Sequence, residues 1–284
     1  NSVVINRCRK PANADILVPG DTVCVIGTTS TRVPYEECDH LKVTPDEVDL
    51  LLTEGAKLAP CLAETRVLRA YAGVRPLVSA DNDPSGRNIS RGIVCLDHES
   101  RDGIKGFISI TGGKLMTYRL MGEMAADAVC KKLGVSASCV TAVTPLPGSE
   151  PGGIEEIAKK IWEVPTMVQK ASVGRFGTQA ANLDFDGDVK GSLVCECEEV
   201  SVSEVDSAIE NLEVNNLVDL RRRTRFGMGT CQGELCACRA AGRLAKASKC
   251  TEKARRDLKD FMNERWKGMY PVAWGETLRE CAYT

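Results

Sequence analysis

The sequence has no long apolar run and no excess of charge of one sign. No stretch of its 284 residues approaches the roughly 20 consecutive apolar residues that a membrane-spanning helix needs. It carries 37 lysines and arginines against 39 aspartates and glutamates, with both signs mixed along the chain. We therefore expect no transmembrane segment and no basic surface for nucleic acid. With 43% hydrophobic and 27% charged residues, the chain is expected to be globular.

The sequence also lacks a dinucleotide-binding motif and an initiator methionine, and it has few histidines. The Gly-x-Gly-x-x-Gly pattern, which binds the pyrophosphate of a dinucleotide after a first strand, does not occur in the sequence. Only two histidines are present, His40 and His98, and a lone histidine is more often a surface or core residue than a general base. An initiator methionine is also missing, and we expect the chain to be a piece of a longer protein.

Cysteine, by contrast, is abundant. The 14 cysteines indicate either a secreted disulfide framework or an intracellular protein that uses some of them as metal ligands. No secretory signal opens the chain, and a chain of this length can bury a core without disulfides. Five of the cysteines fall in two clusters, Cys195/Cys197 and Cys231/Cys236/Cys238. We therefore expect reduced thiols, with metal ligands among these five.

Strand and helix signals alternate in the first part of the chain. Two β-branched runs flank Pro19-Gly20-Asp21 and predict a hairpin over 15–27. Thr44, Pro45 and Glu47 predict the capped start of a helix over 45–58. Periodicity predicts the remaining elements. These are strands over 67–77, 92–96 and 106–110 and a long amphipathic helix over 114–133.

A stretch rich in serine, threonine, proline and glycine over 136–153 indicates a domain boundary. One or two short helices are expected before residue 190. From Leu193 onward the pattern is compact and mostly helical, with predicted helices over 201–212, 216–222, 235–247 and 251–266. We therefore expect three segments, 1–135, 136–190 and 191–284.

Cys195-Glu-Cys197 and Cys231-Gln-Gly-Glu-Leu-Cys236 are two close pairs separated by 33 residues. Two close pairs joined by a helical insert are what a four-thiolate metal site requires. Zinc sites more often use pairs spaced by two residues, whereas the spacing of the first pair suits a binuclear iron centre in which each pair binds its own iron. Zinc and a chance grouping remain alternatives, and Cys238 is a rival to Cys236 as the fourth ligand.

Four arginines, Arg221, Arg222, Arg223 and Arg225, precede the second cysteine pair. A [2Fe–2S] cluster with four thiolate ligands carries net negative charge, so nearby guanidinium groups would offset this charge and raise the reduction potential. The alternative is a solvated helix end, which is the commoner state of such a run.

Gly112 and Gly113 stand directly before the predicted helix over 114–133. Backbone N–H groups at a helix start are unpaired, and the positive end of the helix dipole favours an anion. A flavin that has accepted hydride carries negative charge on one edge of its ring, which such a helix start would stabilise. A pair of glycines before a helix is, however, usually only a tight turn.

Arg75 is followed by Pro76 near the end of the strand predicted over 67–77. An arginine at a strand end that faces a cavity presents a fixed guanidinium, which can bind a phosphate or a developing alkoxide. An ion pair with Asp81 or Asp83 is an equally good interpretation of the sequence.

Three segments in the second half of the chain carry a family resemblance. They run from Leu193 to Glu198, from Arg221 to Arg239 and from Phe261 to Gly268. They resemble the carboxy-terminal region of the large, FAD-dependent catalytic subunits of anaerobic sn-glycerol-3-phosphate dehydrogenases. That region is similar to the [2Fe–2S] domain of bacterioferritin-associated ferredoxin, whose second cysteine pair is spaced more closely than Cys231 and Cys236.

The resemblance implies a mixed α+β fold in three parts. Residues 1–135 are implied to be the carboxy-terminal, incomplete part of an FAD-dependent oxidoreductase domain of the amino-acid-oxidase-like type, built of sheet and helices. Residues 136–190 are implied to be a linker with short helices. Residues 191–284 are implied to form a small, mainly helical [2Fe–2S] domain with a C-terminal tail.

The resemblance extends to the first half of the chain and implies roles for single residues. The segment from Gly112 to Arg119 is similar to the one with which these enzymes close over the isoalloxazine ring of FAD. The implied FAD contacts are Gly112, Gly113, Lys114, Leu115, Met116 and Thr117, and the implied cluster ligands are Cys195, Cys197, Cys231 and Cys236. The family's catalytic, substrate-contacting arginine matches Arg75 and a second one matches Arg91, while Lys114 and Thr117 also reach the substrate.

Together these residues imply oxidation of glycerol 3-phosphate to dihydroxyacetone phosphate at FAD. Electrons would pass through the [2Fe–2S] cluster to partner subunits and a membrane quinone, at a peripheral site on the cytoplasmic side of the bacterial inner membrane. Because only the latter half of the family's catalytic subunit is matched, the chain alone is expected to bind FAD poorly and to be inactive. Two alternatives are a zinc-stabilised interaction module and a related flavin oxidoreductase acting on an amino or hydroxy acid.

Overall fold

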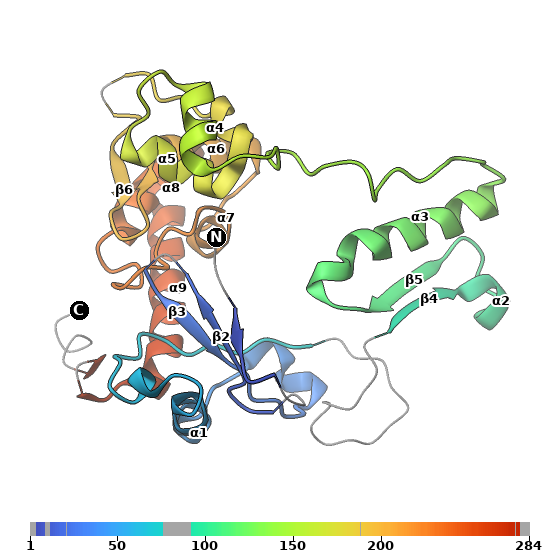
Figure 1. The fold of residues 1–284 in the computed structure, drawn as a ribbon, viewed down its shortest axis with the longest axis horizontal. Helices are drawn as coiled ribbons and strands as arrows, with labels where there is room; N and C mark the ends of the chain where they lie inside the picture. The colour runs from blue at the N-terminus through green and yellow to red at the C-terminus, as the bar shows by residue number, and fades with distance from the viewer. Residues whose placement is uncertain are drawn as a thin grey trace. The chain divides into compact units, whose positions relative to one another are not determined.

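The structure is a computed structural model, which describes residues 4–8, 12–20, 22–75, 92–187, 189–275 and 277–278 (Figure 1). Its contacts group the chain into two compact units. The first comprises Asn1–Thr29, Lys42–Ala72 and Pro147–Thr284, and the second comprises Ser30–Leu41 and Gly73–Leu146. The three segments expected from the sequence divide the chain along its length and stay a prediction. Among the described residues, no helix has the length and apolar character needed to cross a membrane.

The second unit is built around a β-hairpin. Strands β4 (Ile93–Asp97) and β5 (Ile108–Gly112) pair antiparallel, which confirms the two strands expected there. The connection holds the short helix α2 (His98–Asp102). The His98 ring lies between Asp102, 2.5 Å from its Nδ1, and Ser109, 2.9 Å from its Nε2. The His98 side chain therefore links helix α2 to strand β5.

The helix expected from residue 114 begins four residues later, as α3 (Tyr118–Leu133). The preceding residues form a short 3₁₀ turn, η3 (Leu115–Thr117). The Thr117 hydroxyl accepts a hydrogen bond from the Lys114 N–H at 2.9 Å and donates one to the Lys114 carbonyl at 2.8 Å. Because these bonds close a local turn around Lys114, the helical ladder starts only after Thr117. The same unit contains the 3₁₀ turn η1 (Tyr35–His40).

The amino-terminal part of the first unit is a three-stranded antiparallel sheet, β1 (Ile5–Asn6), β2 (Ile16–Pro19) and β3 (Cys24–Gly27). Strands β2 and β3 confirm the predicted hairpin. Helix α1 (Pro45–Ala56) follows, and its start is the expected capping box, in which Thr44 and Glu47 exchange side-chain and backbone hydrogen bonds. The 3₁₀ turn η2 (Pro60–Ala63) comes next.

The strand expected over 67–77 is wrong for its described part, which ends at Arg75 and contains no strand. Instead, residues 66–70 run along helix α9 (Thr251–Met269). The Ala70 N–H donates to the Gly268 carbonyl at 2.9 Å, and Arg69 Nη2 donates to the Glu264 carbonyl at 3.2 Å. The alternation of residue types in this segment is typical of a strand. In the structure, however, the segment binds carbonyl groups near the C-terminal end of α9.

Two short helices confirm the expectation for residues 154–190. They are α4 (Ile154–Ile161) and α5 (Met167–Phe176), followed by the 3₁₀ turn η4 (Gly177–Asn182). Ile157, Ala158, Val173 and Ala180 form their small common core. Arg175 connects this core to the next one, because its guanidinium binds both carboxylate oxygens of Glu204, at 2.7 and 2.9 Å, and the carbonyls of Glu198 and Glu199.

The carboxy-terminal part has the largest core. A short hairpin, β6 (Leu193–Cys195) and β7 (Val200–Ser201), leads into α6 (Val202–Asn211) and α7 (Leu217–Thr224); α8 (Ala237–Ser248), α9 and the 3₁₀ turn η5 (Tyr270–Val272) complete it (Figure 1). Each predicted helix is present, and Ser201 with Glu204 forms the predicted capping box. The fully buried side chains include Val200, Val205, Leu217, Leu220 and Phe226. This core carries the loops that contain the cysteine clusters.

We expect Arg175→Ala to destabilise the protein by about 3–5 kcal/mol, because it leaves the Glu204 carboxylate buried without its counter-charge. The matched control is Arg223→Ala, which removes an exposed ion pair with Asp219 on α7 and should cost less than about 1 kcal/mol. Urea unfolding followed by circular dichroism measures both values. Equal costs for the two variants would contradict the role given to Arg175.

A second prediction compares alanine substitutions at two glycines of the second unit. Gly112 has φ +80°, and a Cβ there would lie 2.2 Å from the Gly92 carbonyl oxygen. Gly103 has a similar φ of +73° but open space around it. Alanine at either position should lower the free energy of unfolding by about 1–2 kcal/mol, because the backbone is left-handed there. Gly112→Ala must in addition displace the β4–β5 pairing. We expect faster amide hydrogen exchange in β4 and β5 for Gly112→Ala than for Gly103→Ala.

Candidate metal centre and flavin-facing loop

Four cysteine thiols approach one another at one end of the carboxy-terminal core. Cys195 ends β6 and Cys197 lies in the turn that follows, whereas Cys231 and Cys236 belong to the loop between α7 and α8. Cys195 and Cys236 are each 1% exposed, and Cys197 and Cys231 are partly exposed. The structure thus brings together the four cysteines expected to bind the metal.

The contacts among these thiols run between the two sequence motifs and also within the second one. Cys197 Sγ lies 3.7 Å from Cys231 Sγ, and Cys236 interacts with both Cys195 and Cys231. Two thiolates bound at about 2.3 Å to one tetrahedral metal ion lie about 3.8 Å apart. The observed separation matches that of two ligands of one ion with one cysteine from each motif, which differs from the expectation that each pair binds its own iron.

The thiols compete for protons because they are close together. A hydrogen bond with Cys236 lowers the pKa of Cys195 and of Cys231, while these two neighbours raise the pKa of Cys236. Burial raises the pKa of Cys197. Backbone N–H groups add to the stabilisation of thiolates, from Gly227 to Cys195 and from Gly233 to Cys231. All four thiols can be ionised together only if a cation compensates their charge, which is what a bound metal does.

Cys238 does not join this group. It lies exposed in the first turn of α8, and in the described part of the chain no sulfur contact links it to the four thiols. The sequence leaves open whether Cys236 or Cys238 is the fourth ligand. In the structure, Cys236 is a buried thiol inside the group of four, and Cys238 is an exposed thiol outside it.

Glycines give the ligand loop the space that it needs. A Cβ on Gly229 would lie 2.4 Å from the Cβ of Cys197, so a side chain there would push the two cysteine-bearing loops apart. Gly227 and Gly233 adopt φ angles of +69° and +95°, and a Cβ on Gly233 would lie 2.5 Å from the Phe261 ring. Only glycine fits these positions without a shift of the neighbouring chain.

The glutamates beside the first pair of cysteines are neutralised by arginines. Arg239 binds Glu196 through two hydrogen bonds, at 2.5 and 2.6 Å. Arg225 binds the buried Glu198 at 2.8 Å, and Thr22, in the turn between β2 and β3, donates to the same carboxylate at 2.6 Å. No local sequence signal indicates the Thr22 contact, because the two residues are far apart along the chain.

The four arginines expected to offset the cluster charge lie in three different environments. Arg222 and Arg223 are exposed, as in the solvated alternative, and Arg223 pairs with Asp219. Arg225 is bound to Glu198. Arg221 is half-buried, and its guanidinium donates to the Gly227 carbonyl and to Gln232 Oε1, both at 3.3 Å. Only Arg221 therefore extends its charge into the ligand loop.

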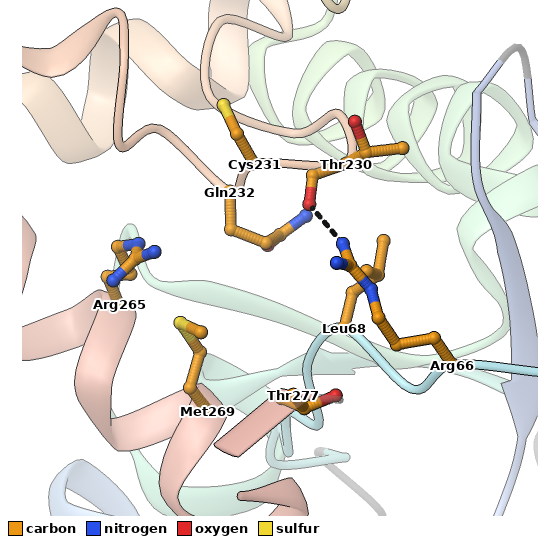
Figure 2. A pocket seen from close by; sticks show the side chains of 8 residues that line it. All are labelled: Arg66, Leu68, Thr230, Cys231, Gln232, Arg265, Met269 and Thr277. Carbon is orange, nitrogen blue, oxygen red and sulfur yellow. Dashed lines mark hydrogen bonds between the residues drawn. The ribbon is translucent and has the colours of Figure 1, made fainter. Parts of the chain in front are cut away.

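A small cavity lies beside the ligand loop (Figure 2). Arg66 Nη2 donates to the Thr230 carbonyl across it, at 3.0 Å, directly before Cys231. Arg265 and Met269 from α9 line its other side. Its volume of about 10 Å³ is at the lower limit for a single water molecule. The cavity is therefore too small for a substrate, and Arg66 holds the ligand loop instead.

Among the described residues no group of three or more ligating side chains is arranged to hold a metal ion as it stands, but the four cysteine thiols are the donor set of a [2Fe–2S] cluster. Such clusters are held by four cysteine thiolates, with backbone N–H groups bonded to sulfur. Cys195, Cys197, Cys231 and Cys236 supply the thiols, and Gly227 and Gly233 supply N–H groups. The glycine-rich backbone also leaves the loops close enough for both motifs to share one cluster.

The loop expected to face the flavin lies in the second unit. Gly112 ends β5, and Gly113 has φ +69°, with no room for a side chain because a Cβ would lie 2.7 Å from Thr117 Oγ1. Lys114 is exposed, and Leu115 and Met116 are 92% and 82% exposed. These apolar side chains are available for contact with a planar ring. The Thr117 hydroxyl is occupied in the turn around Lys114, so its first role is to shape the loop.

The two arginines expected to contact substrate are only partly described. Arg75 is exposed, at the end of a described stretch in the second unit. Arg91 lies outside the described residues, as do Pro76, Asp81 and Asp83, so the structure does not decide between a substrate contact and an ion pair for Arg75. Lys114, Thr117 and Arg75 belong to the same unit.

Comparison with known proteins gives two family matches. Residues 4–119 match the family described as FAD dependent oxidoreductase, and residues 193–244 match the BFD-like [2Fe-2S] binding domain. The chain thus combines part of a flavin oxidoreductase fold with a small helical iron–sulfur domain, which confirms the expected fold class and the expected cofactors, FAD and a [2Fe–2S] cluster. The zinc alternative finds no support in these matches.

Single related proteins give a more specific comparison than the family matches. The three described next are each named as one subunit of an anaerobic glycerol-3-phosphate dehydrogenase. The chain is 60% identical to the subunit from Haemophilus influenzae, over 100% of this chain and 50% of that protein. It is 59% identical to the corresponding one from Escherichia coli, over 100% of this chain and 52% of that protein. A relative from Haloferax volcanii is 39% identical over 98% of the chain and 47% of its own length. The resemblance expected from the sequence is therefore confirmed along the whole chain.

The chain spans about half the length of these curated relatives. No solved structure shows significant similarity to it.

The ligand set makes a direct prediction. After anaerobic reconstitution, Cys236→Ser should lose most of its iron and labile sulfide, because serine replaces a buried thiol inside the group of four. Cys238→Ser should retain both at wild-type stoichiometry, because its thiol is exposed outside the group. The measurement is iron and acid-labile sulfide per chain. Loss in Cys238→Ser with retention in Cys236→Ser would reverse the assignment.

Proposed function

We propose that the chain supplies the iron–sulfur centre and the substrate-facing residues of an FAD-dependent sn-glycerol-3-phosphate dehydrogenase. The observation that carries the proposal is the convergence of Cys195, Cys197, Cys231 and Cys236 in a segment that matches a BFD-like [2Fe-2S] binding domain. The relatives named above support the choice of substrate, since the identity to them extends over the whole chain.

In this proposal Cys195, Cys197, Cys231 and Cys236 hold the [2Fe–2S] cluster. The buried pairing of Glu198 with Arg225 and Thr22 fixes the turn after Cys197, and Arg66 fixes the carbonyl before Cys231. Rigid ligand loops keep the ligand geometry similar in the two oxidation states and so lower the reorganisation needed for electron transfer.

On the substrate side, Gly112, Gly113, Lys114, Leu115, Met116 and Thr117 form the loop that faces the flavin. When bound, FAD would supply the acceptor for the hydride that leaves C2 of glycerol 3-phosphate as the C2 hydroxyl loses its proton. Arg75 stabilises the developing alkoxide, and Arg91 and Lys114 bind the phosphate through charge-assisted hydrogen bonds. The exposed Leu115 and Met116 exclude water from the ring.

When bound, the cluster would supply an electron-transfer centre toward partner subunits and a membrane quinone. The relatives named above are each one subunit of an enzyme, which supports a multi-subunit assembly. We propose a peripheral location at the cytoplasmic side of the inner membrane, where partner subunits supply the attachment.

The substrate assignment predicts that Arg75→Ala lowers kcat/KM for glycerol 3-phosphate by about 10²–10³, the usual effect of losing one group that stabilises an oxyanion. Dye reduction by the full-length, FAD-loaded enzyme measures this value. Arg101→Ala is the matched control, since Arg101 is another exposed arginine of the same unit, beside Asp102. It should leave kcat/KM unchanged.

The result for Arg75→Ala separates the substrate assignment from the cluster assignment. Unchanged turnover would contradict the role of Arg75, whereas the visible absorption and reduced-state EPR signal of a binuclear cluster would be present in either case. Zinc without labile sulfide in the purified protein would contradict the cluster. Turnover of an amino or hydroxy acid in preference to glycerol 3-phosphate would contradict the substrate.

A further inference from the structure

The four thiols differ in what holds them in place. Cys195 ends strand β6 and Cys236 directly precedes helix α8, and both are buried. Cys197 and Cys231 lie in loops and are partly exposed, with their Sγ atoms 3.7 Å apart. The regular structure of the carboxy-terminal core therefore fixes one ligand of each motif, whereas the exposed ligand of each motif depends on the contacts that its loop makes.

The turn between β2 and β3 holds the loop of Cys197. Thr22 Oγ1 donates to Glu198 Oε1 at 2.6 Å and Arg225 Nε donates to Glu198 Oε2 at 2.8 Å, so both oxygens of this carboxylate are bound. The Glu198 side chain is 1% exposed. A Cβ on Gly229 would lie 3.3 Å from Glu198 Oε1 and 2.4 Å from the Cβ of Cys197. The oxygen that Thr22 binds is therefore packed where the two ligand loops meet.

Arg66 holds the loop of Cys231. Its Nη2 donates to the Thr230 carbonyl at 3.0 Å, directly before Cys231 (Figure 2). The hydroxyl of the same threonine lies 3.7 Å from Cys197 Sγ. Arg66 therefore binds a residue that contacts one exposed ligand and precedes the other.

Thr22 and Arg66 both belong to the segment that matches the oxidoreductase family, and they lie in the same compact unit as the ligand loops. We propose that these two residues retain the [2Fe–2S] cluster by keeping Cys197 and Cys231 on it, and that cluster binding in turn stabilises the β2–β3 hairpin. The inference rests on the proposed cluster. Both are positioning residues, because they act through Glu198 and Thr230 rather than by touching the iron.

The physical reason is the effective concentration of the exposed ligands. A thiolate that leaves the iron rebinds before the cluster is lost if its loop is held near the metal, and it rebinds more slowly if the loop is free to move. The coupling is reciprocal, because a contact that favours cluster binding is itself favoured when the cluster is bound. The hairpin and the cluster should therefore stabilise each other.

The first test is the rate at which an iron chelator removes iron from the full-length enzyme with its reconstituted cluster. Thr22→Val removes a donor to a buried carboxylate, and we expect iron release to be about fivefold to thirtyfold faster. Thr22→Ser retains a hydroxyl and should restore a rate close to that of wild type. Thr29→Val is the matched control, because Thr29 donates to the Glu47 carboxylate of α1 at 3.0 Å, and its rate should stay within about twofold of wild type.

Arg66→Met tests the second contact. It removes the donor to the Thr230 carbonyl but keeps a long apolar stem, and it should also accelerate iron release. Arg69→Met is the control from the same segment, since Arg69 donates to the Glu264 carbonyl of α9 at 3.2 Å, and it should accelerate release less. The EPR signal of the reduced cluster should broaden in Thr22→Val and Arg66→Met, because the geometry of the exposed ligands becomes heterogeneous, and it should be unchanged in both controls.

Amide hydrogen exchange tests the reciprocal effect. Removal of the cluster should speed exchange in β2 and β3, and it should leave β4 and β5 unchanged because they belong to the other compact unit. In Thr22→Val the same removal should change exchange in β2 and β3 less, because the contact that couples the hairpin to the cluster is already lost.

The proposal is overturned if Thr22→Val and Arg66→Met release iron within about twofold of the wild-type rate, or if their controls accelerate release as much as they do. Equal exchange in β2 and β3 with and without the cluster would overturn the reciprocal effect. Zinc without labile sulfide in the wild-type protein would instead contradict the proposed function. The rate of zinc release from the same variants would then test the two contacts in the same way.

Discussion

The proximity of four thiols is the constraint on which the rest of the carboxy-terminal structure depends. Cys195, Cys197, Cys231 and Cys236 come from two loops on one core and lie close enough to change one another's proton affinity. Ionising all four concentrates negative charge in a mostly buried place, which is stable only with strong compensation. A bound metal would be the main compensation, and the glycines, backbone N–H groups and arginines around the loops would make its binding geometry possible.

The polar framework around the thiols draws on residues far apart in the sequence. Arg175 from α5 binds Glu204 and the carbonyls after Cys197. Thr22 and Arg66, from the segment that matches the flavin oxidoreductase family, bind Glu198 and the carbonyl of Thr230. The iron–sulfur loops are therefore held by more than the small domain that contains their cysteines. Part of the oxidoreductase match, residues 4–29 and 42–72, lies in the same compact unit as the iron–sulfur match.

The loop over residues 112–117, which we propose faces the flavin, differs from the thiol loops because its shape is decided by local interactions. Gly112 and Gly113 adopt left-handed backbone angles, and Thr117 closes the turn around Lys114. Such short-range hydrogen bonds can be anticipated from glycine, threonine and their spacing. What could not be anticipated is that the turn delays the start of α3, since the apolar periodicity continues without interruption through Leu115 and Met116.

The sequence by itself determined the helices with capping boxes, the cysteine motifs and the family resemblance, because each depends on residues close together or on a pattern retained along the chain. Thr44 with Glu47 and Ser201 with Glu204 are examples. Only the tertiary structure decided that residues 66–70 bind α9 instead of forming a strand and that Cys236 rather than Cys238 lies among the thiols. These outcomes depend on which distant groups share a buried space, and burial is a property of the folded chain that local sequence does not encode.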